Sequence, residues 1–411
     1  MCRALAGVAV LLALTGFGSL DQNHAECAGQ AGGGARQIAA CTQIINDATA
    51  GANMRGTAYF MRGNGWGSDY QRAIADYDQA IELTPGIAEY YVRRGLAWIH
   101  QGDDVRALAD LQRAIDLGTT RPDAYNARGV IWERKGDYDR AIADYDKAIS
   151  QDPKTVNAYM NRASVWGKKG DYQRAVADFD MAIANDPKRA EAYYERGFTR
   201  GKAGDKDGEL ADYDETITLN PKHTYAYVSR AVLWLTKGDN DRAIADYDQA
   251  ISLNPQGANS YVNRGVAHAH KGEFDQALAD FDKAISLDAK HANAYNGRGL
   301  VRFSRSEIDL AIADYDKAIH LNPKFAEAYN NRGLAWGSKG DVDLAIADYD
   351  QAIGLDPKHT ISYFNRGRAW SEKGDNDRAM ADLNQAITLA PTNPGYYLRG
   401  DKQGETQRQS G

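Results

Sequence analysis

Eight histidines and three cysteines are the side chains of this sequence best suited to metal binding or nucleophilic chemistry. His223, His291 and His359 stand at equivalent loop positions, and His268 and His270 are two residues apart, so this last pair does not share a helix face. None has the spacing of a zinc motif such as H-E-x-x-H. The few serines lie outside any nucleophile-elbow context. These residue types predict no enzyme, no metal and no cofactor.

Acidic pairs of the form Asp-Tyr-Asp would suit general acid–base chemistry if they occurred once. Here they recur with a period of 34 residues, and an arginine recurs with them. A catalytic pair appears once in a chain, whereas a pair that recurs in every repeat has a structural role. The arginines are Arg62, Arg94, Arg128, Arg162, Arg196, Arg230, Arg264, Arg298, Arg332 and Arg366.

A partly buried guanidinium needs a carboxylate partner. An aspartate follows each arginine at a fixed distance, which predicts structural ion pairs within a repeat or between neighbours. Examples are Arg128 with Asp144 and Arg332 with Asp348. The alternative is that the arginines are presented to an anionic ligand.

The elements that must position these residues are helices. With Ala88 as position 1, positions 4, 8 and 11 of each unit carry Tyr, Gly or Ala, and usually Trp, which is the spacing of one helix face. Positions 20, 24, 27 and 28 carry Ala, Tyr or Phe, Ala and Ile, a second such face. A Gly-Asp turn such as Gly136-Asp137 separates them. Asp-Pro, as in Asp152-Pro153, follows, where Asp can cap the next helix and Pro can occupy its first position.

The composition is that of one unit repeated. The chain has 411 residues, 26% charged, with 10 prolines and a net charge of −7. This composition excludes collagen, low-complexity disorder and a disulfide-rich mini-fold, and it argues against a strongly basic nucleic-acid binder. A fixed period of this length indicates a solenoid, because no unit can bury both its faces alone.

The segment 326–359, AEAYNNRGLAWGSKGDVDLAIADYDQAIGLDPKH, resembles the tetratricopeptide repeat, with Arg where that family has Leu at position 7. The resemblance covers 56–393. It implies an all-α fold, a right-handed α-solenoid (superhelix) of about ten 34-residue helix-turn-helix repeats. These repeats, numbered one to ten, are 56–87 (two residues short), 88–121, 122–155, 156–189, 190–223, 224–257, 258–291, 292–325, 326–359 and 360–393.

Some repeats depart from the pattern. Repeat five is degenerate, and Arg200, His268 and Arg302 replace the tryptophan of position 11. This replacement is either a specialised patch or drift within a long array. Ser306 replaces the turn glycine. Residues 26–55 resemble a degenerate half-repeat that caps the N-terminal end, and 394–411 a C-terminal cap with a disordered tail.

In this family the inner, concave face is lined by first-helix positions 2, 5, 6, 9, 12 and 13. The resemblance implies that a partner polypeptide contacts these positions. Asparagine has a donor and an acceptor, so a row of asparagines can bind an extended backbone, and aromatic residues can add apolar pockets. The alternative is that they are solvated surface. The candidates are Asn126, Asn161, Tyr194, Asn263, Asn296, Asn330, Asn331, Phe364 and Asn365.

Residues 1–25 resemble a secretory signal. Arg3 supplies the positive start, and the apolar run 4–17 is shorter than the roughly 20 residues that span a bilayer. Cleavage is expected after Ala25 or at Gly18, with an uncleaved anchor as the alternative. Cys27 and Cys41 would remain as an even pair. In an exported chain such a pair suggests a disulfide, with free thiols or a metal pair as alternatives.

The sequence therefore predicts an exported protein, periplasmic or secreted. We expect a non-catalytic scaffold that binds protein or peptide segments along the concave face. The alternative is a structural or assembly component of the cell envelope that acts through self-association. We expect no nucleic-acid partner, and no membrane span once the signal is removed.

Overall fold

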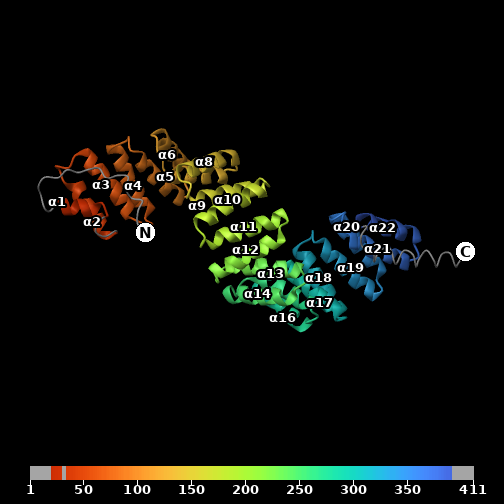
Figure 1. Ribbon diagram of the computed structural model, residues 1–411. Helices are drawn as coiled ribbons and strands as arrows, with labels where there is room; N and C mark the ends of the chain where they lie inside the picture. Colours follow the sequence, from red (N-terminus) through yellow and green to blue (C-terminus); the bar gives the residue numbers. More distant parts are fainter. Residues whose placement is uncertain (1–19, 30–33, 391–411) are drawn as a thin grey trace. The chain divides into compact units, whose positions relative to one another are not determined.

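The computed structural model describes residues 20–29 and 34–390, and the regular structure of these ranges is entirely helical (Figure 1). The chain divides into two compact units, Met1–Asp205 and Lys206–Gly411. The division falls in the turn between the two helices of repeat five. The predicted all-α architecture of paired helices is confirmed. Most of the predicted signal and the predicted C-terminal cap lie outside the described residues.

In both units consecutive helices pack against each other, as Figure 1 shows. The helices of the first unit are α1 (Leu20–Cys27), α2 (Ala35–Asn46), α3 (Ala52–Gly65), α4 (Tyr70–Leu83), α5 (Ala88–His100), α6 (Asp104–Asp116), α7 (Pro122–Arg134), α8 (Tyr138–Gln151), α9 (Val156–Lys168), α10 (Tyr172–Asn185) and α11 (Ala190–Ala203).

From α5 onward the first helix of each repeat has an odd number and begins at repeat position 1. The helices of the second unit are α12 (Lys206–Leu219), α13 (Thr224–Thr236), α14 (Asn240–Leu253), α15 (Ala258–His270), α16 (Phe274–Leu287), α17 (Ala292–Ser304), α18 (Ile308–Leu321), α19 (Ala326–Lys339), α20 (Val342–Leu355), α21 (Thr360–Glu372) and α22 (Asn376–Leu389).

Glycine and aspartate form the turn inside most repeats, with Glu273 and Glu307 replacing the aspartate in repeats seven and eight. Gly136 has a φ of 78°, a left-handed conformation that ends the first helix, and the Asp137 side chain accepts from the backbone N–H of Arg140 to begin the second. Repeat eight departs from this pattern. Its Ser306 adopts a φ of 63°, a conformation that disfavours a residue with a Cβ.

The loop between repeats differs from the sequence prediction. Asp152 does not cap the next helix, because α9 begins at Val156 with Thr155 as its N-cap. Instead the Asp152 side chain accepts from the backbone N–H of Lys154 at 2.9 Å, and Pro153 lies in the resulting turn. The prediction failed because the Asp-Pro pair forms a local turn before the helix can start.

Small residues at position 8 let the two helices of a repeat approach closely. A Cβ added to Gly129 would lie 2.6 Å from Cε1 of Tyr145, a fully buried ring at position 24. Ala141 and Ala148, on either side of that ring, are fully buried too. In most repeats the interior therefore has an aromatic ring at position 24 packed between small residues, with Leu111 and Leu383 in its place in repeats two and ten.

The N-terminal segment is fastened by a disulfide. Cys27, at the end of α1, is bonded to Cys41 in α2, and both side chains are buried. The Gln37 side chain donates to the Cys27 carbonyl at 3.2 Å and to the Met61 carbonyl of α3 at 3.1 Å. The predicted cleavage point after Ala25 lies inside α1. No described helix combines the length and the apolar character needed to cross a membrane.

Candidate binding surfaces on the first helices

The repeated arginines hold neighbouring repeats together. Arg332 donates through Nε and Nη2 to both oxygens of Asp348 in its own repeat, at 2.8 and 2.7 Å. Its Nη1 donates to Asp316 of the preceding repeat at 2.5 Å. Arg128 binds Asp144 in the same bidentate way and reaches Gln112 instead of an aspartate. Pairing therefore occurs both within a repeat and between repeats, and it uses both carboxylates of the Asp-Tyr-Asp motif.

These ion pairs are partly buried. The Arg332 side chain is 21% exposed and that of Asp348 is 8% exposed. Burial raises the pKa of the Asp110 carboxyl, and the hydrogen bond from Arg94 opposes that rise. The hydrogen bond to Asp144 is the main cause that raises the pKa of Arg128. Guanidinium groups held in this way serve the structure and present little of their charge to a ligand.

Position 11 supplies a further donor to the same aspartate. Trp66 Nε1 donates to Asp76 at 2.7 Å, and Arg302, which stands where repeat eight lacks tryptophan, donates to Asp314 at 2.8 Å. His268 Nε2 of repeat seven lies 3.9 Å from Asp280. Tryptophan, arginine and histidine all carry an N–H group, and this shared property is the signal that sequence reasoning missed. In repeat eight the replacement keeps the hydrogen bond to the aspartate, and in repeat seven it places a ring nitrogen near it.

An arginine at position 19 accompanies the tryptophan in every tryptophan repeat except repeat nine, where Leu344 stands at position 19 and Lys339 lies over Trp336. The Arg106 guanidinium lies 3.7 Å from the ring centroid of Trp98, and Arg378 lies 3.5 Å from that of Trp370, which are cation–π contacts. The repeats without tryptophan have no arginine there. Their position-19 residues are Gly208, Gln276 and Leu310.

The asparagines predicted to contact a partner largely bind one another. An asparagine at position 6 donates to the one at position 5 of the preceding repeat, at 3.0 to 3.1 Å. The pairs are Asn161 with Asn126, Asn331 with Asn296, and Asn365 with Asn330.

Four of these six side chains are at most 8% exposed: Asn296, Asn330, Asn331 and Asn365. Their amides are occupied inside the protein, so the unliganded structure does not offer them as an open row. Asn126 and Asn161, with Asn263, Tyr194 and Phe364, are half-buried. The exposed first-helix positions are chiefly 2 and 9.

In repeats six to eight of the second unit these positions form an uncharged surface, which we call the neutral face; charge returns in repeats nine and ten with Glu327 and Arg368. Positions 2 and 9 are two turns apart and lie on the same side of a helix, and α15 contacts both α13 and α17. Apart from the arginines of position 7 and Arg302, these three helices contain no Asp, Glu, Lys or Arg. The neutral face consists of Tyr225, Val232, Asn259, Val266, Asn293 and Leu300.

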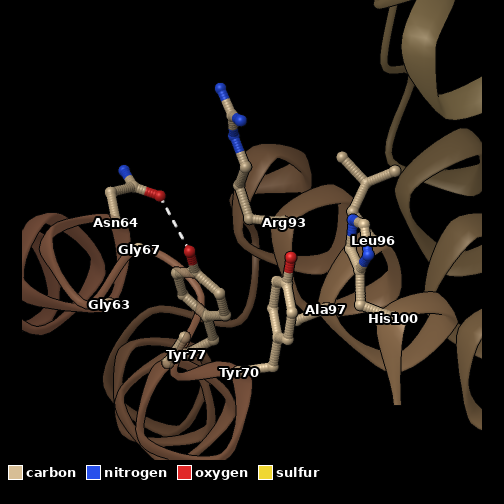
Figure 2. A pocket seen from close by; sticks show the side chains of 10 residues that line it. Gly63, Asn64, Gly67, Tyr70, Tyr77, Arg93, Leu96, Ala97 and His100 are labelled. Atoms are coloured by element: carbon tan, nitrogen blue, oxygen red, sulfur yellow. Dashed lines mark hydrogen bonds between the residues drawn. The ribbon is translucent and has the colours of Figure 1, made fainter. Parts of the chain in front are cut away.

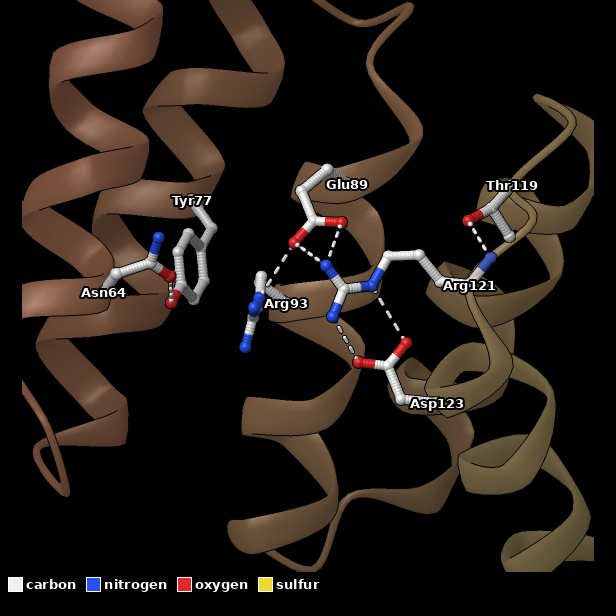
Figure 3. A network of polar contacts seen from close by, with 7 residues as sticks. All are labelled: Asn64, Tyr77, Glu89, Arg93, Thr119, Arg121 and Asp123. Carbon is white, nitrogen blue, oxygen red and sulfur yellow. Dashed lines mark hydrogen bonds and ion pairs between the residues drawn. The ribbon is translucent and has the colours of Figure 1, made fainter. Parts of the chain in front are cut away.

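In repeats two and three of the first unit, position 2 instead carries ion pairs, shown in Figure 3. Glu89 at position 2 of α5 accepts from Arg93 Nε at 2.9 Å and from Arg121 Nη1 at 2.8 and 2.9 Å. Arg121 also donates to both oxygens of Asp123, at 2.9 and 2.6 Å. We call these four residues the charged network. Among the described residues no group of three His, Cys, Asp or Glu side chains could hold a metal ion.

Models of the tetratricopeptide repeat match most of the chain. One model matches 67–122, 106–156, 133–190, 161–224, 199–258 and 228–292, and three others match 299–337, 326–359 and 361–393. The chain belongs to the tetratricopeptide-repeat family. Proteins of this family generally mediate protein–protein interactions or act as scaffolds, and the fold is typically non-catalytic.

Solved structures of the same fold are similar to the chain at low identity. The crystal structure of the APC/C hetero-tetramer Cut9-Hcn1 covers 84% of this chain and 76% of that one, with 17% identity and a TM-score of 0.50. That of yeast Tom70 covers 94% and 95%, with 15% identity and a TM-score of 0.49. That of MamA covers 39% and 93%, with 30% identity and a TM-score of 0.35. No curated protein matches the sequence.

Proposed function

We propose that this protein is a non-catalytic scaffold whose second unit binds partner polypeptide segments on the neutral face. The observation that carries the proposal is the exposure of apolar side chains on a surface without charge. Tyr225, Val232 and Leu300 are 72%, 42% and 45% exposed. Exposed apolar side chains on neighbouring helices are suited to interaction, because covering them releases about 25 cal/mol per Å² of apolar area.

The composition of the neutral face selects the chemistry of the partner. A charged side chain would lose water there and meet no opposite charge, which is costly. An apolar side chain would lose no favourable hydration there. The amides of Asn259 and Asn293, both exposed, can bind the backbone of a docked segment. The preferred partner is therefore an apolar, uncharged polypeptide segment.

The test is a pair of matched variants in the full chain. Partners are crosslinked in cells, identified, and reduced to the shortest peptide that binds. Val232→Lys with Leu300→Lys should weaken that peptide by at least about tenfold, because a docked apolar segment would desolvate the ammonium groups. Leu310→Lys is the control, since Leu310 is 50% exposed on α18 of the same repeat as Leu300 and lies outside the neutral face.

Equal loss in both variants, or loss in neither, would contradict the proposal. Sedimentation of the same variants addresses the alternative role in envelope assembly. If the double lysine variant no longer self-associates, and the wild type binds no peptide, the surface serves assembly and not partner capture.

We further propose that the protein is exported to the periplasm or secreted. Arg3, the apolar run 4–17 and the Cys27–Cys41 pair support this proposal. Fractionation and N-terminal sequencing should find an exported chain that begins near residue 26 or residue 19. A chain that retains Met1 in the reducing cytoplasm, with both thiols reactive, would contradict it.

A further inference from the structure

A pocket of about 400 Å³ lies between repeats one and two, separate from the neutral face (Figure 2). Such a volume falls in the range of small-ligand sites. Its walls come from α3, α4 and α5 and from the turn at Gly67. The lining residues used below are Asn64, Tyr70, Tyr77, Arg93, Leu96 and His100.

The short first repeat accounts for the pocket. Four residues separate Trp98 from Asp103 in repeat two, whereas two residues separate Trp66 from Asp69 in repeat one. As a result α3 ends at Gly65, before the helix positions that correspond to Ile99 and His100. Repeat one therefore lacks a residue at position 12, and the space that a side chain at position 12 would fill stays open.

Repeat three shows which chemistry fits that space. Its position 12 is Glu133, and one carboxylate oxygen accepts from the hydroxyl of Tyr145 at 2.9 Å. The other accepts from Ser164 at 3.2 Å and from Lys168 at 2.7 Å, both in the next repeat. The residues of the pocket at the same three repeat positions are Tyr77, Leu96 and His100. A carboxylate thus occupies the equivalent place elsewhere in the same molecule.

The polar groups of the pocket favour an anion. None of its described lining residues carries a carboxylate, and Arg93 supplies a positive charge. Of the three Arg93 guanidinium nitrogens, only Nε donates to Glu89. The two terminal nitrogens have no hydrogen bond to the described residues. A guanidinium presents these nitrogens as a fork that matches a carboxylate. Burial raises the pKa of Tyr77 to about 12, which keeps its phenol neutral.

The other walls favour a flat ring. The rings of Tyr70 and His100 stack with centroids 4.4 Å apart and an interplanar angle of 4°. Tyr77 lines the pocket as well and donates to Asn64 Oδ1 at 2.8 Å, as Figure 2 shows. Aromatic walls of this kind pack against planar groups in offset or edge-to-face arrangements.

We propose that this pocket binds a small planar carboxylate, with Arg93 holding the carboxylate and the aromatic walls holding the ring. The ligand can be a free aromatic acid or the C-terminal aromatic residue of a polypeptide, because both present the same chemistry. This site is independent of the partner surface on the second unit.

The test uses the full chain and ligand-observed NMR with calorimetry. The probes are benzoate, phenylacetate and indole-3-acetate, each with its neutral amide, and short peptides that end in phenylalanine with a free or an amidated terminus. At least one acid or free-terminus peptide should bind, and its amide should bind at least about tenfold more weakly. Preference for the free acids assigns a small molecule, and preference for the peptides assigns a polypeptide terminus.

Two variants locate the binding. Arg93→Gln should weaken the acid at least about tenfold. Replacing residues 67–68 by a copy of residues 133–136 restores position 12 with its own glutamate and should abolish binding. Arg134→Gln, with the same change of charge on the next first helix, should bind as the wild type does. Circular dichroism checks that each variant folds.

Three results would overturn the proposal. The first is no binding of any acid or peptide at about 10 mM, near the weak limit of measurable affinity. The second is equal binding of acids and amides. The third is binding that survives both the arginine substitution and the restored turn.

Discussion

The first helices of repeats two and three, in the first unit, expose a different surface from those of repeats six to eight, in the second unit, on the same framework. In the first unit, position 2 carries Glu89 and Asp123, which are held in the charged network by Arg93 and Arg121. In the second unit, the three helices of the neutral face expose apolar and amide side chains. Because both units have the same ion pairs beneath, the difference shows that the surface varies independently of the structure that supports it.

The reason lies in which residues have inward partners. The arginine of position 7 and the aspartate of position 23 are tied to each other, so neither can change alone without leaving a buried charge. Positions 2 and 9 have no partner of that buried kind; where position 2 is paired, as Glu89 is with Arg93 and Asn259 with His291, the pair lies near the surface. Their residues can therefore differ between repeats at little cost in stability.

The largest effect should come from breaking the shared framework. Arg94→Met and Arg332→Met each leave buried aspartates without a partner and should each cost about 3–5 kcal/mol. The effect should be similar in the two units, as measured by urea unfolding followed by circular dichroism. Arg134→Met, whose side chain is 44% exposed, should cost less than about 1 kcal/mol. A large loss in one unit alone would contradict a common framework.

A smaller effect should come from filling the close helix contacts. A Cβ at Gly333 would lie 2.7 Å from Tyr349 Cε1 and 3.1 Å from the Ala345 carbonyl oxygen, so Gly333→Ala should cost about 1–3 kcal/mol. Gly129→Ala in the first unit should behave alike. Gly354→Ala is the matched control, because open space surrounds that glycine and alanine is the better helix former by about 1 kcal/mol. Stabilisation by Gly333→Ala would show that the two helices can separate freely.

Salt should distinguish the charged network of the first unit from the buried asparagine pairs of the second. Glu89→Gln should cost about 0.5–1 kcal/mol at low ionic strength and much less in about 1 M salt, where exposed charges are screened. Asn365→Ala should cost about 1 kcal/mol at either ionic strength, because it removes a buried hydrogen bond between neutral groups. Thermal melts of both variants at two salt concentrations make the measurement. If both variants showed the same salt dependence, the proposed electrostatic difference would be contradicted.

The smallest effect is expected in the turn of repeat eight. Ser306→Gly should stabilise the second unit by about 0.5–1 kcal/mol, because glycine adopts a φ of 63° without a Cβ penalty. The reverse change at Gly136 of the first unit, Gly136→Ser, should destabilise by a similar amount. Thermal melts of the two variants would measure these changes in stability. If neither melting temperature shifts, the turn does not take part in cooperative unfolding.

The framework was accessible from the sequence, whereas much of the surface was not. The period, the helix pairs and the Arg–Asp pairing follow from residue spacing, because position on a helix dictates which side chains can meet. The burial of Asn330 and Asn331 did not follow, since it depends on how closely neighbouring first helices pack. The equivalence of tryptophan and Arg302 was hidden as well, because it appears only when both are seen to donate to the same aspartate.

The sequence by itself determined the repeat, its turns and the identity of the paired charges, because these depend on distances of at most one repeat along the chain. The tertiary structure decided which polar groups remain available. It joined Asn365 to Asn330 across 35 residues, and it left the space of a missing position 12 open beside Arg93 and His100. Such outcomes depend on packing between repeats, and an isolated unit does not contain that information.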